Sequence, residues 1–194
     1  MSSPLTTVAW PLTTARLSIR PATAEDVEAA WRYRQDPSVG HWITSAPESF
    51  EAFTELFTNA RTLAKTLLVE LHGEVIGDLM LSVEDAWAQT EVRHRATGVQ
   101  AEVGWAFDLR HGGQGYATEA VAELLRISFE DLGLRRVRAV CFAENEPSWR
   151  LMERLDMRRE EHSVRDALHR SRGWIDGLTY ALLADEWRAR RPTS

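Results

Sequence analysis

The sequence predicts one α/β domain (α+β in the arrangement of its elements) with a mixed, mostly antiparallel sheet. Three observations predict it. The chain has 194 residues, enough for one sizeable core but too few for two comfortable domains. Strand-like runs alternate with helical stripes, and short turns between neighbouring runs favour antiparallel hairpins. One strand is followed by a helix and another strand, an order that permits a parallel pair.

The composition is typical of a soluble globular protein, with 44% hydrophobic and 27% charged residues. The formal net charge of −6 gives no basic surface for nucleic acid, so direct nucleic-acid binding is not expected. Cys141 is the single cysteine and can form no internal disulfide. No stretch of 18 apolar residues and no basic leader with an apolar core is present. We therefore expect a cytoplasmic protein with no membrane partner.

The domain is expected at residues 15–190, after an N-terminal extension at 1–14. Its first element is a short strand at 17–20, where apolar and polar residues alternate until Pro21.

Two helices are expected next. Thr23 and Asp26 have the spacing of a capping box, and helical periodicity then continues until Asp36 and Pro37. A second start signal at 45–48 precedes an apolar and partly aromatic stripe at helical spacing. The stripe consists of Phe50, Phe53, Leu56, Phe57, Ala60 and Leu63. Such a stripe is more often core than the lining of a substrate cavity.

A hairpin and a long loop follow. The runs at 66–71 and 75–83 are strand-like and flank His72 and Gly73, which predicts an antiparallel hairpin. Residues 84–100 lose periodicity, and long loops in compact domains are often functional. This loop is therefore a candidate border of the substrate site.

The fourth strand, at 101–109, leads through a glycine-rich turn into a helix that continues to Leu132. Gly133 stands where a C-cap glycine belongs. The fifth strand, at 135–142, can lie parallel to the fourth after this helical crossover.

The last part of the chain predicts a short helix and an antiparallel pair. A turn at 143–148 precedes the helix, which is expected at 149–155. Two strand-like runs between 158 and 183 then flank the turn at Arg172 and Gly173.

The glycine-rich turn at 110–117 reads Arg-His-Gly-Gly-Gln-Gly-Tyr-Ala. A turn that opens a helix presents unpaired N–H groups at the positive end of the helix dipole, which suits a phosphate. The turn has no P-loop lysine, and Thr118 stands where a dinucleotide fingerprint needs a smaller residue. A nucleoside triphosphate and a dinucleotide are therefore both disfavoured.

The pattern Arg-x-x-Gly-x-Gly at 110–115 closely resembles the acyl-CoA-binding motif of the GNAT superfamily of N-acyltransferases. Asn145-x-x-Ser148 and residues 153–157 resemble later segments of the same family. The resemblance covers roughly residues 15–190 by element order. It implies a GNAT-like domain whose sheet is splayed between the fourth and fifth strands and has helices on both faces.

Within the superfamily the chain looks most like the RimJ/RimL type, the N-terminal acetyltransferases of ribosomal proteins. Residues 17–23, 102–105 and 178–183 carry this finer resemblance. It implies direct acetyl transfer from the co-substrate acetyl-CoA to an amine acceptor such as a protein N-terminus, by a monomer or a homodimer. A small-molecule acceptor, such as an aminoglycoside or a polyamine, and a non-catalytic CoA-binding regulatory protein are the alternatives.

The resemblance also implies the residues that bind the cofactor. The turn would hold the pyrophosphate, while the backbone at the end of the fourth strand and the Asn145 side chain would hold the pantetheine. These residues are Phe107, Leu109, Arg110, His111, Gly112, Gly113, Gln114, Gly115, Tyr116, Ala117, Thr118 and Asn145.

Two residues are candidates for proton transfer. Glu102 is the candidate base, against the alternative of a surface carboxylate or an ion-pair partner. Ser148 is the candidate donor to the CoA thiolate, against a role as N-cap of a helix that begins at Trp149. Other branches of the family place a tyrosine where this chain has Met152. No histidine or cysteine has metal-ligand spacing, so no metal is expected.

Overall fold

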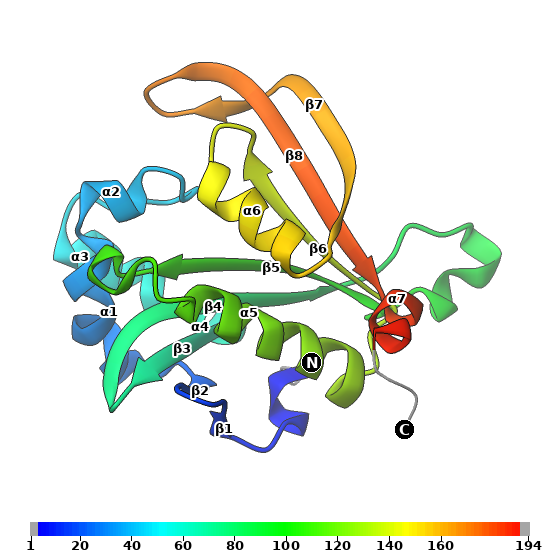
Figure 1. Ribbon diagram of the computed structural model, residues 1–194, viewed down its shortest axis with the longest axis horizontal. Coiled ribbons are helices and arrows are strands. Elements are labelled where there is room, and N and C mark those ends of the chain that lie inside the picture. The colour runs from blue at the N-terminus through cyan, green and yellow to red at the C-terminus, as the bar shows by residue number, and fades with distance from the viewer. Residues whose placement is uncertain (1–3, 191–194) are drawn as a thin grey trace. The chain divides into compact units, whose positions relative to one another are not determined.

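A computed structural model describes residues 4–190, and Figure 1 shows the elements in chain order. The strands are β1 (Leu12–Thr13), β2 (Ser18–Pro21), β3 (Thr66–Leu71), β4 (Glu74–Glu84), β5 (Gln100–Phe107), β6 (Arg136–Phe142), β7 (Arg158–His169) and β8 (Gly173–Leu183). The α-helices are α1 (Val27–Arg34), α2 (Pro37–Gly40), α3 (Phe50–Phe57), α4 (Ala60–Leu63), α5 (Tyr116–Arg126), α6 (Glu146–Arg154) and α7 (Ala184–Ala189). Other short helical segments are η1 (Pro4–Thr7), η2 (Ala24–Asp26), η3 (Thr90–Arg95), η4 (Leu109–His111) and the π-helical η5 (Ile127–Asp131).

The strands form a mixed sheet in the order β1-β2-β3-β4-β5-β6-β8-β7. β5 and β6 run parallel, whereas β1/β2, β2/β3, β3/β4, β6/β8 and β7/β8 run antiparallel. The parallel pairing ends at Glu102 and Arg138, well before either strand ends, in agreement with the splay expected there. The predicted α/β class and mostly antiparallel sheet are confirmed.

Two compact units can be distinguished within this domain. The first combines the chain up to residue 81 with residues 104–124, and the second combines residues 82–103 with the chain from residue 125 onward. No helix of residues 4–190 is long and apolar enough to cross a membrane.

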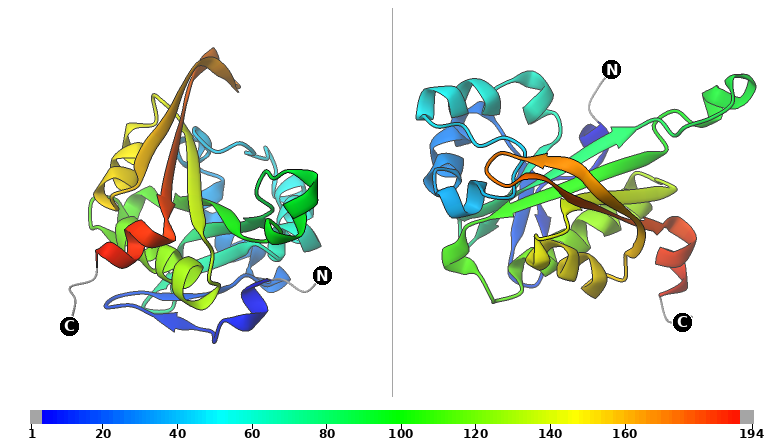
Figure 2. Two further views of the ribbon diagram at one scale, coloured as in Figure 1. Left: turned by 90° about the vertical axis from the view of Figure 1, so that its right-hand side faces the viewer. Right: turned by 90° about the horizontal axis from the view of Figure 1, so that it is seen from above.

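In the first unit α1 and α3 pack against the sheet (Figures 1 and 2), and aromatic side chains contribute to the core there. Phe53 and Phe57 are buried and stack with ring centroids 5.4 Å apart, and Trp31 of α1 lies 5.2 Å from Phe53. Leu68 of β3 and Val75 of β4 belong to the same cluster. Phe53 and Phe57 of the stripe are therefore core, the more common of its two interpretations.

The central strands of the first unit are covered on both faces. Leu67, Leu68 and Val69 follow one another in β3, and all three are fully buried. Since successive side chains of a strand point to opposite faces, both faces of β3 are shielded from solvent.

The helix expected from 45–48 to Leu63 differs from the prediction in its start and its continuity. It begins after Ser49, whose hydroxyl accepts a hydrogen bond from the Ala52 N–H at 3.2 Å. It ends at Phe57, and a separate helix, α4, begins after its N-cap residue Asn59. Leu56, expected on the apolar stripe, is 39% exposed.

α2 was not predicted from the sequence, because Pro37 was interpreted only as a stop signal. Proline is also favoured at the start of a helix, where its missing N–H has no intrahelical partner. Here the Asp36 carboxylate caps the new helix by accepting a hydrogen bond from the Ser38 N–H at 2.8 Å.

Both turns expected to join antiparallel strands are confirmed. His72 and Gly73 have positive φ angles of 51° and 82°, as required of a two-residue hairpin turn between β3 and β4. Gly173 has a φ of 73° where β7 turns into β8.

In the second unit, α6 lies beside the long β7–β8 hairpin (Figure 2). The Tyr180 hydroxyl, buried in β8, donates to Glu153 of α6 at 2.8 Å. Arg159 of β7 donates from Nε to the same hydroxyl at 2.7 Å. One tyrosine therefore joins the helix to both strands of the hairpin.

The segment expected as a long loop at 84–100 has structure of its own. It contains η3 and is closed at its base by a hydrogen bond of 2.7 Å from the Ala86 N–H to the Ala96 carbonyl. The Asp85 carboxylate also accepts from the Gly98 N–H at 2.8 Å. Trp87 in this segment is 95% exposed.

The helix after the glycine-rich turn ends where the sequence predicts. α5 continues as the π-helical η5, in which the Leu132 N–H donates to the Ile127 carbonyl at 2.9 Å. Gly133 follows with a φ of 63°, so the predicted C-cap glycine is confirmed.

Candidate functional site

The glycines of the turn at 112–115 are required for two different reasons. Gly113 and Gly115 have φ angles of 74° and 82°, a left-handed conformation that glycine adopts without strain. Gly112 has a negative φ of −65°, but a Cβ there would lie only 3.0 Å from the Leu109 carbonyl oxygen. Any side chain at these positions would strain or crowd the turn.

The turn leaves a run of backbone N–H groups unpaired. The Glu119 N–H makes the first hydrogen bond of α5, to the Gly115 carbonyl at 3.0 Å. Among the residues that the structure describes, no partner is found for the N–H groups of 113–118. Six amides at a helix N-terminus can hold an anionic group.

The amides of His111 and Gly112 lie in the turn expected to hold the pyrophosphate, but they bond to the chain just before it. The His111 N–H donates to the Asp108 carbonyl and the Gly112 N–H to the Leu109 carbonyl, each at 3.0 Å. The unpaired amides therefore begin at Gly113, because residues 109–112 form a turn of 3-10 helix.

Asp108 fixes the start of the turn. Its carboxylate is buried and accepts hydrogen bonds from the backbone N–H and Nε of Arg110, both at 2.9 Å. The Asp108 N–H donates to the Ile76 carbonyl of β4 at 2.9 Å. Its hydrogen bonds from Arg110 hold the pKa of Asp108 below its usual range, although burial opposes this. The Arg110 guanidinium therefore stabilises the turn by pairing with the Asp108 carboxylate.

Two cofactor candidates precede the unpaired amides. Leu109 was expected at the end of the fourth strand, but the strand ends at Phe107 and Leu109 is 56% exposed. The chain turns at Asp108, which ends the two-residue alternation. Phe107 is half-buried beside Gly77, where an added Cβ would lie 2.6 Å from its ring.

The His111 ring faces the same buried carboxylate. Its Nδ1 lies 3.9 Å from the Asp108 Oδ2, beyond hydrogen-bond distance. This nitrogen is buried, and within residues 4–190 it has no hydrogen-bond partner.

Glu102, the candidate base, forms an ion pair across the parallel strands. Its carboxylate lies 2.7 Å from Nη2 of Arg138, its register partner on β6. The same nitrogen lies 3.2 Å from the carboxylate of Glu84. The ion-pair alternative for Glu102 is therefore observed, and any proton that Glu102 accepts is taken up beside a guanidinium.

Ser148 is not a helix cap. α6 begins at Glu146 with Asn145 as the N-cap residue, which places Ser148 inside the first turn. The helix therefore begins three residues before the predicted start at Trp149, because Pro147 was interpreted as part of the preceding turn. In the described chain, no hydrogen bond involves the Ser148 hydroxyl or the Asn145 side-chain amide, and both residues are half-buried.

Two other side chains lack properties that the chemistry would need. Met152, at the place of the family's tyrosine, is 1% exposed and has no group that donates a proton. Burial raises the pKa of the Cys141 thiol to about 11, so the thiol is protonated at neutral pH. Residues 4–190 contain no group of three or more His, Cys, Asp or Glu side chains that could hold a metal ion.

The candidate residues fall into two groups within the fold. Phe107 and the turn up to Thr118 lie in the first compact unit, whereas Glu102, Asn145 and Ser148 lie in the second. Four residues that support the turn were not predicted from the sequence, namely Thr14, Arg16, Asp108 and Glu119. An aspartate at the start of a turn is a local signal that could have identified Asp108. Arg16 and Glu119 are 103 residues apart, so no local signal connects them.

Comparison with known proteins identifies related chains over most of this length. The family described as acetyltransferase (GNAT) domain matches residues 16–158. The uncharacterized N-acetyltransferase YnaD of Bacillus subtilis is 32% identical over 179 residues, which cover 91% of this chain and 98% of YnaD. A GNAT-family acetyltransferase from Bacillus anthracis is 31% identical and has a TM-score of 0.76 over 91% of this chain and all of its own. Mycobacterium smegmatis RimJ, solved in complex with CoA-disulfide, has a TM-score of 0.72 at 23% identity over 88% of this chain and 83% of its own, which shows a shared fold.

Proposed function

The chain belongs to the GNAT family of acetyltransferases and is an acetyl-CoA-dependent N-acetyltransferase, and we propose that its acceptor is a protein or peptide N-terminus, as in the RimJ/RimL type. The unpaired N–H groups of 113–118 carry the proposal that this turn holds acetyl-CoA. A diphosphate is an anion that such a cradle can bind without any basic side chain.

The residues of the turn fit the cofactor by their chemistry. Gly113 and Gly115 keep the backbone free of side chains beside the amides, and no atom lies within 4 Å of a Cβ added at Gly113. We assign the pyrophosphate to the amides of 113–118 and the pantetheine to the backbone near Phe107 and Leu109 and to the Asn145 amide. Arg110, His111 and Gly112 support this cradle through the turn that they form.

In the reaction the amine nitrogen attacks the thioester carbonyl, a C–N bond forms and the C–S bond breaks. We assign Glu102 as the base that takes the amine proton, directly or through water, and Ser148 as the donor to the departing thiolate. The Arg138 guanidinium pairs with the Glu102 carboxylate at 2.7 Å and fixes its position on β5. The half-buried Ser148 hydroxyl has no competing partner among the described residues.

Replacement of Gly113 tests the cradle. A tryptophan there would occupy the space next to the unpaired amides, so Gly113→Trp should abolish acetyl-CoA binding in calorimetry. Gly173→Trp is the matched control, because Gly173 also has a left-handed φ and nothing within 4 Å of an added Cβ. Equal affinity in the parent and the Gly113 variant would refute the cradle.

Substitution of Glu102 tests the base. Glu102→Gln should lower kcat by roughly 10²- to 10⁴-fold, the usual contribution of a positioned base. Glu84→Gln is the control, because it removes the other carboxylate bound to Arg138 and should retain activity. Undiminished acetylation by Glu102→Gln would show that the base is assigned wrongly.

A second substitution tests the proton donor. Ser148→Ala should lower kcat by about 10²-fold or more while the KM for acetyl-CoA changes little. Its helix content, measured by circular dichroism, should match the parent because Ser148 does not cap α6. An unchanged kcat would rule out the donor role.

The acceptor can be identified with labelled acetyl-CoA. Incubation with peptides of different N-termini, polyamines and aminoglycosides should label the α-amines of peptides preferentially. Preference for a small amine would replace the proposed acceptor class. Binding of acetyl-CoA without turnover on any amine would instead favour the regulatory alternative.

A further inference from the structure

We propose that Arg16 is a positioning residue of the cofactor turn, which clamps the turn and neutralises the carboxylate of Glu119 so that the amide cradle accepts a diphosphate. This inference rests on the proposed acetyl-CoA site at 113–118. It assigns a role to a residue that lies nearly one hundred positions before that site in the sequence.

Arg16 contacts the turn through several atoms. Its Nη1 donates to the Gln114 carbonyl at 2.9 Å, and its guanidinium lies 4.5 Å from the centre of the Tyr116 ring. Its Nη2 lies 3.5 Å from the position of a Cβ added at Gly115. The guanidinium therefore lies directly beside the backbone whose amides are unpaired.

The Glu119 carboxylate holds Arg16 beside the turn through two hydrogen bonds. The Arg16 Nε donates to Glu119 Oε2 at 2.7 Å, and the Arg16 backbone N–H donates to Oε1 at 2.9 Å. The Thr14 hydroxyl also donates to Oε1, at 2.5 Å. The Thr14 hydroxyl also accepts a hydrogen bond from the Leu17 N–H at 3.0 Å, which closes residues 14–17 into a separate turn.

Glu119 is a negative charge within the first turn of α5. Burial raises its pKa, but the hydrogen bonds from Thr14 and Arg16 outweigh burial and lower the pKa below its usual range. Glu119 is therefore ionised at neutral pH. Without a counter-charge, this carboxylate would repel a diphosphate and compete with it for the positive end of the helix dipole.

Arg16 neutralises the negative charge of Glu119 by direct contact. The Glu119 side chain is 17% exposed and the Arg16 side chain 44%, so the pair is partly shielded from solvent and remains sensitive to ionic strength. The paired carboxylate no longer opposes the anion, while the amides of 113–118 remain unpaired. Arg16 thus allows an acidic residue to anchor the chain segment 14–17 without weakening the anion cradle.

The test measures CoA binding by calorimetry for Arg16→Gln, for Glu119→Gln and for the double variant. Arg16→Gln should weaken CoA roughly three- to tenfold, the range expected for an uncompensated charge at a helix terminus. The weakening should be larger at low ionic strength. Glu119→Gln should lose no affinity, and the double variant should recover most of the loss.

Controls separate this effect from general damage to the fold. S-acetylpantetheine lacks the diphosphate, so Arg16→Gln should bind it as the parent does, and kcat at saturating acetyl-CoA should be unchanged. Arg20→Gln removes another arginine that pairs with two carboxylates, Asp26 and Glu70, in the same unit and should leave CoA affinity unchanged.

Three results would overturn the inference. These are parental CoA affinity in Arg16→Gln, a double variant as weak as Arg16→Gln, or an equal loss for S-acetylpantetheine. Failure of the parent protein itself to bind CoA would instead contradict the proposed cofactor site, so the two failures are distinguishable.

Discussion

At Asp156 the backbone adopts a left-handed conformation, with a φ of 50°. This position follows α6, in the segment that resembles Glu-Lys-Leu-Gly-Phe of the GNAT family, and it corresponds to the glycine of that segment. The turn is retained because Met157 is buried and Arg190 donates to the Asp156 carbonyl at 2.6 Å. Aspartate tolerates this conformation better than most residues but at a cost that glycine does not have.

Substitutions at Asp156 should show this cost. We expect Asp156→Gly to match or exceed the parent in stability and Asp156→Ala to be less stable than Asp156→Gly by about 1 kcal/mol. Urea unfolding of the three proteins measures the difference. The same stability for Ala and Gly would contradict a backbone origin.

A buried polar pair in the first unit is a second feature at the residue scale. The Tyr33 hydroxyl of α1 donates to Asp78 of β4 at 2.5 Å, and Arg34 Nε lies 3.0 Å from the same carboxylate. Burial, with the Asp78 charge, raises the pKa of Tyr33 well above its usual value. Tyr33 therefore remains a neutral donor across the physiological range.

Removal of that hydroxyl should destabilise the protein. Tyr33→Phe leaves a buried carboxylate with one donor fewer, which should cost about 1–3 kcal/mol in the free energy of unfolding. Tyr116→Phe is the control, because within residues 4–190 the Tyr116 hydroxyl makes only an exposed contact of 3.2 Å with Gln114. Chemical denaturation of both variants checks the expectation, which equal losses would contradict.

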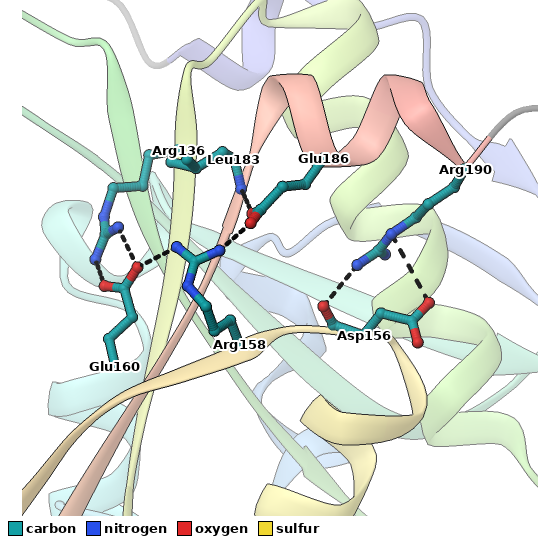
Figure 3. Close-up of polar contacts among 7 residues, drawn as sticks. All are labelled: Arg136, Asp156, Arg158, Glu160, Leu183, Glu186 and Arg190. Carbon is teal, nitrogen blue, oxygen red and sulfur yellow. Dashed lines mark hydrogen bonds and ion pairs between the residues drawn. The ribbon is translucent and has the colours of Figure 1, made fainter.

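At the scale of elements, α7 is held in the second unit by a chain of ion pairs (Figure 3). Glu186 accepts from the Leu183 N–H at 2.8 Å and is bound by Arg158 of β7. Arg158 also donates to Glu160 at 2.6 Å, and Glu160 is bound by Arg136 of β6. The network links β6, β7 and α7.

A second contact holds the far end of α7. Arg190 donates to the Asp156 carbonyl at 2.6 Å, next to the left-handed turn after α6 (Figure 3). It also donates to the Leu155 carbonyl at 2.7 Å. A six-residue helix has little intrinsic stability, so these contacts account for its position.

The network should make stability depend on pH. Hydrogen bonds from Arg136, opposed by burial and aided by Arg158, lower the pKa of Glu160 to about 2 from 4.5. The contribution of Glu160 is therefore present above pH 4.5 and is lost as the pH falls from 4.5 through 2. Because the pair is partly solvated and screened, we expect Glu160→Gln to cost about 1 kcal/mol at neutral pH.

The measurement is urea unfolding of the parent and Glu160→Gln between neutral pH and pH 3, where the difference should shrink. Glu161→Gln is the control on the same strand, because it keeps the oxygen that accepts from Ser163 and removes no ion pair found in residues 4–190. A difference that stays constant as the pH falls would contradict the linkage.

For the whole molecule, the proposed cofactor is also a stabilising ligand. The amides of 113–118 are organised only in the folded chain, so acetyl-CoA should bind the native state and not the unfolded one. At a concentration one hundred times its Kd, acetyl-CoA should raise the free energy of unfolding by about 2.7 kcal/mol. Thermal melting with increasing acetyl-CoA measures this, and an unchanged midpoint in the parent would contradict the proposed site.

Much of the fold could be predicted from the sequence, because its signals are local. Periodicity located the strands within one or two residues at 66–71 and 135–142, and Gly133 marked the end of the crossover helix. Errors arose where one residue type has two meanings. Pro37 and Pro147 each lie in the first turn of a helix, but Pro37 was interpreted as a stop signal and Pro147 as part of a turn.

The sequence by itself determined the class of domain and the glycine turn at 110–115. Consecutive residues define both the conformation of this turn and its resemblance to the acyl-CoA-binding motif. The tertiary structure decided which amides are unpaired, that Glu102 pairs with Arg138, and that Arg16 lies against Glu119. These facts depend on side chains far apart in sequence or on competing local hydrogen bonds. Only folding brings such groups together, so no pattern of neighbouring residues could reveal them.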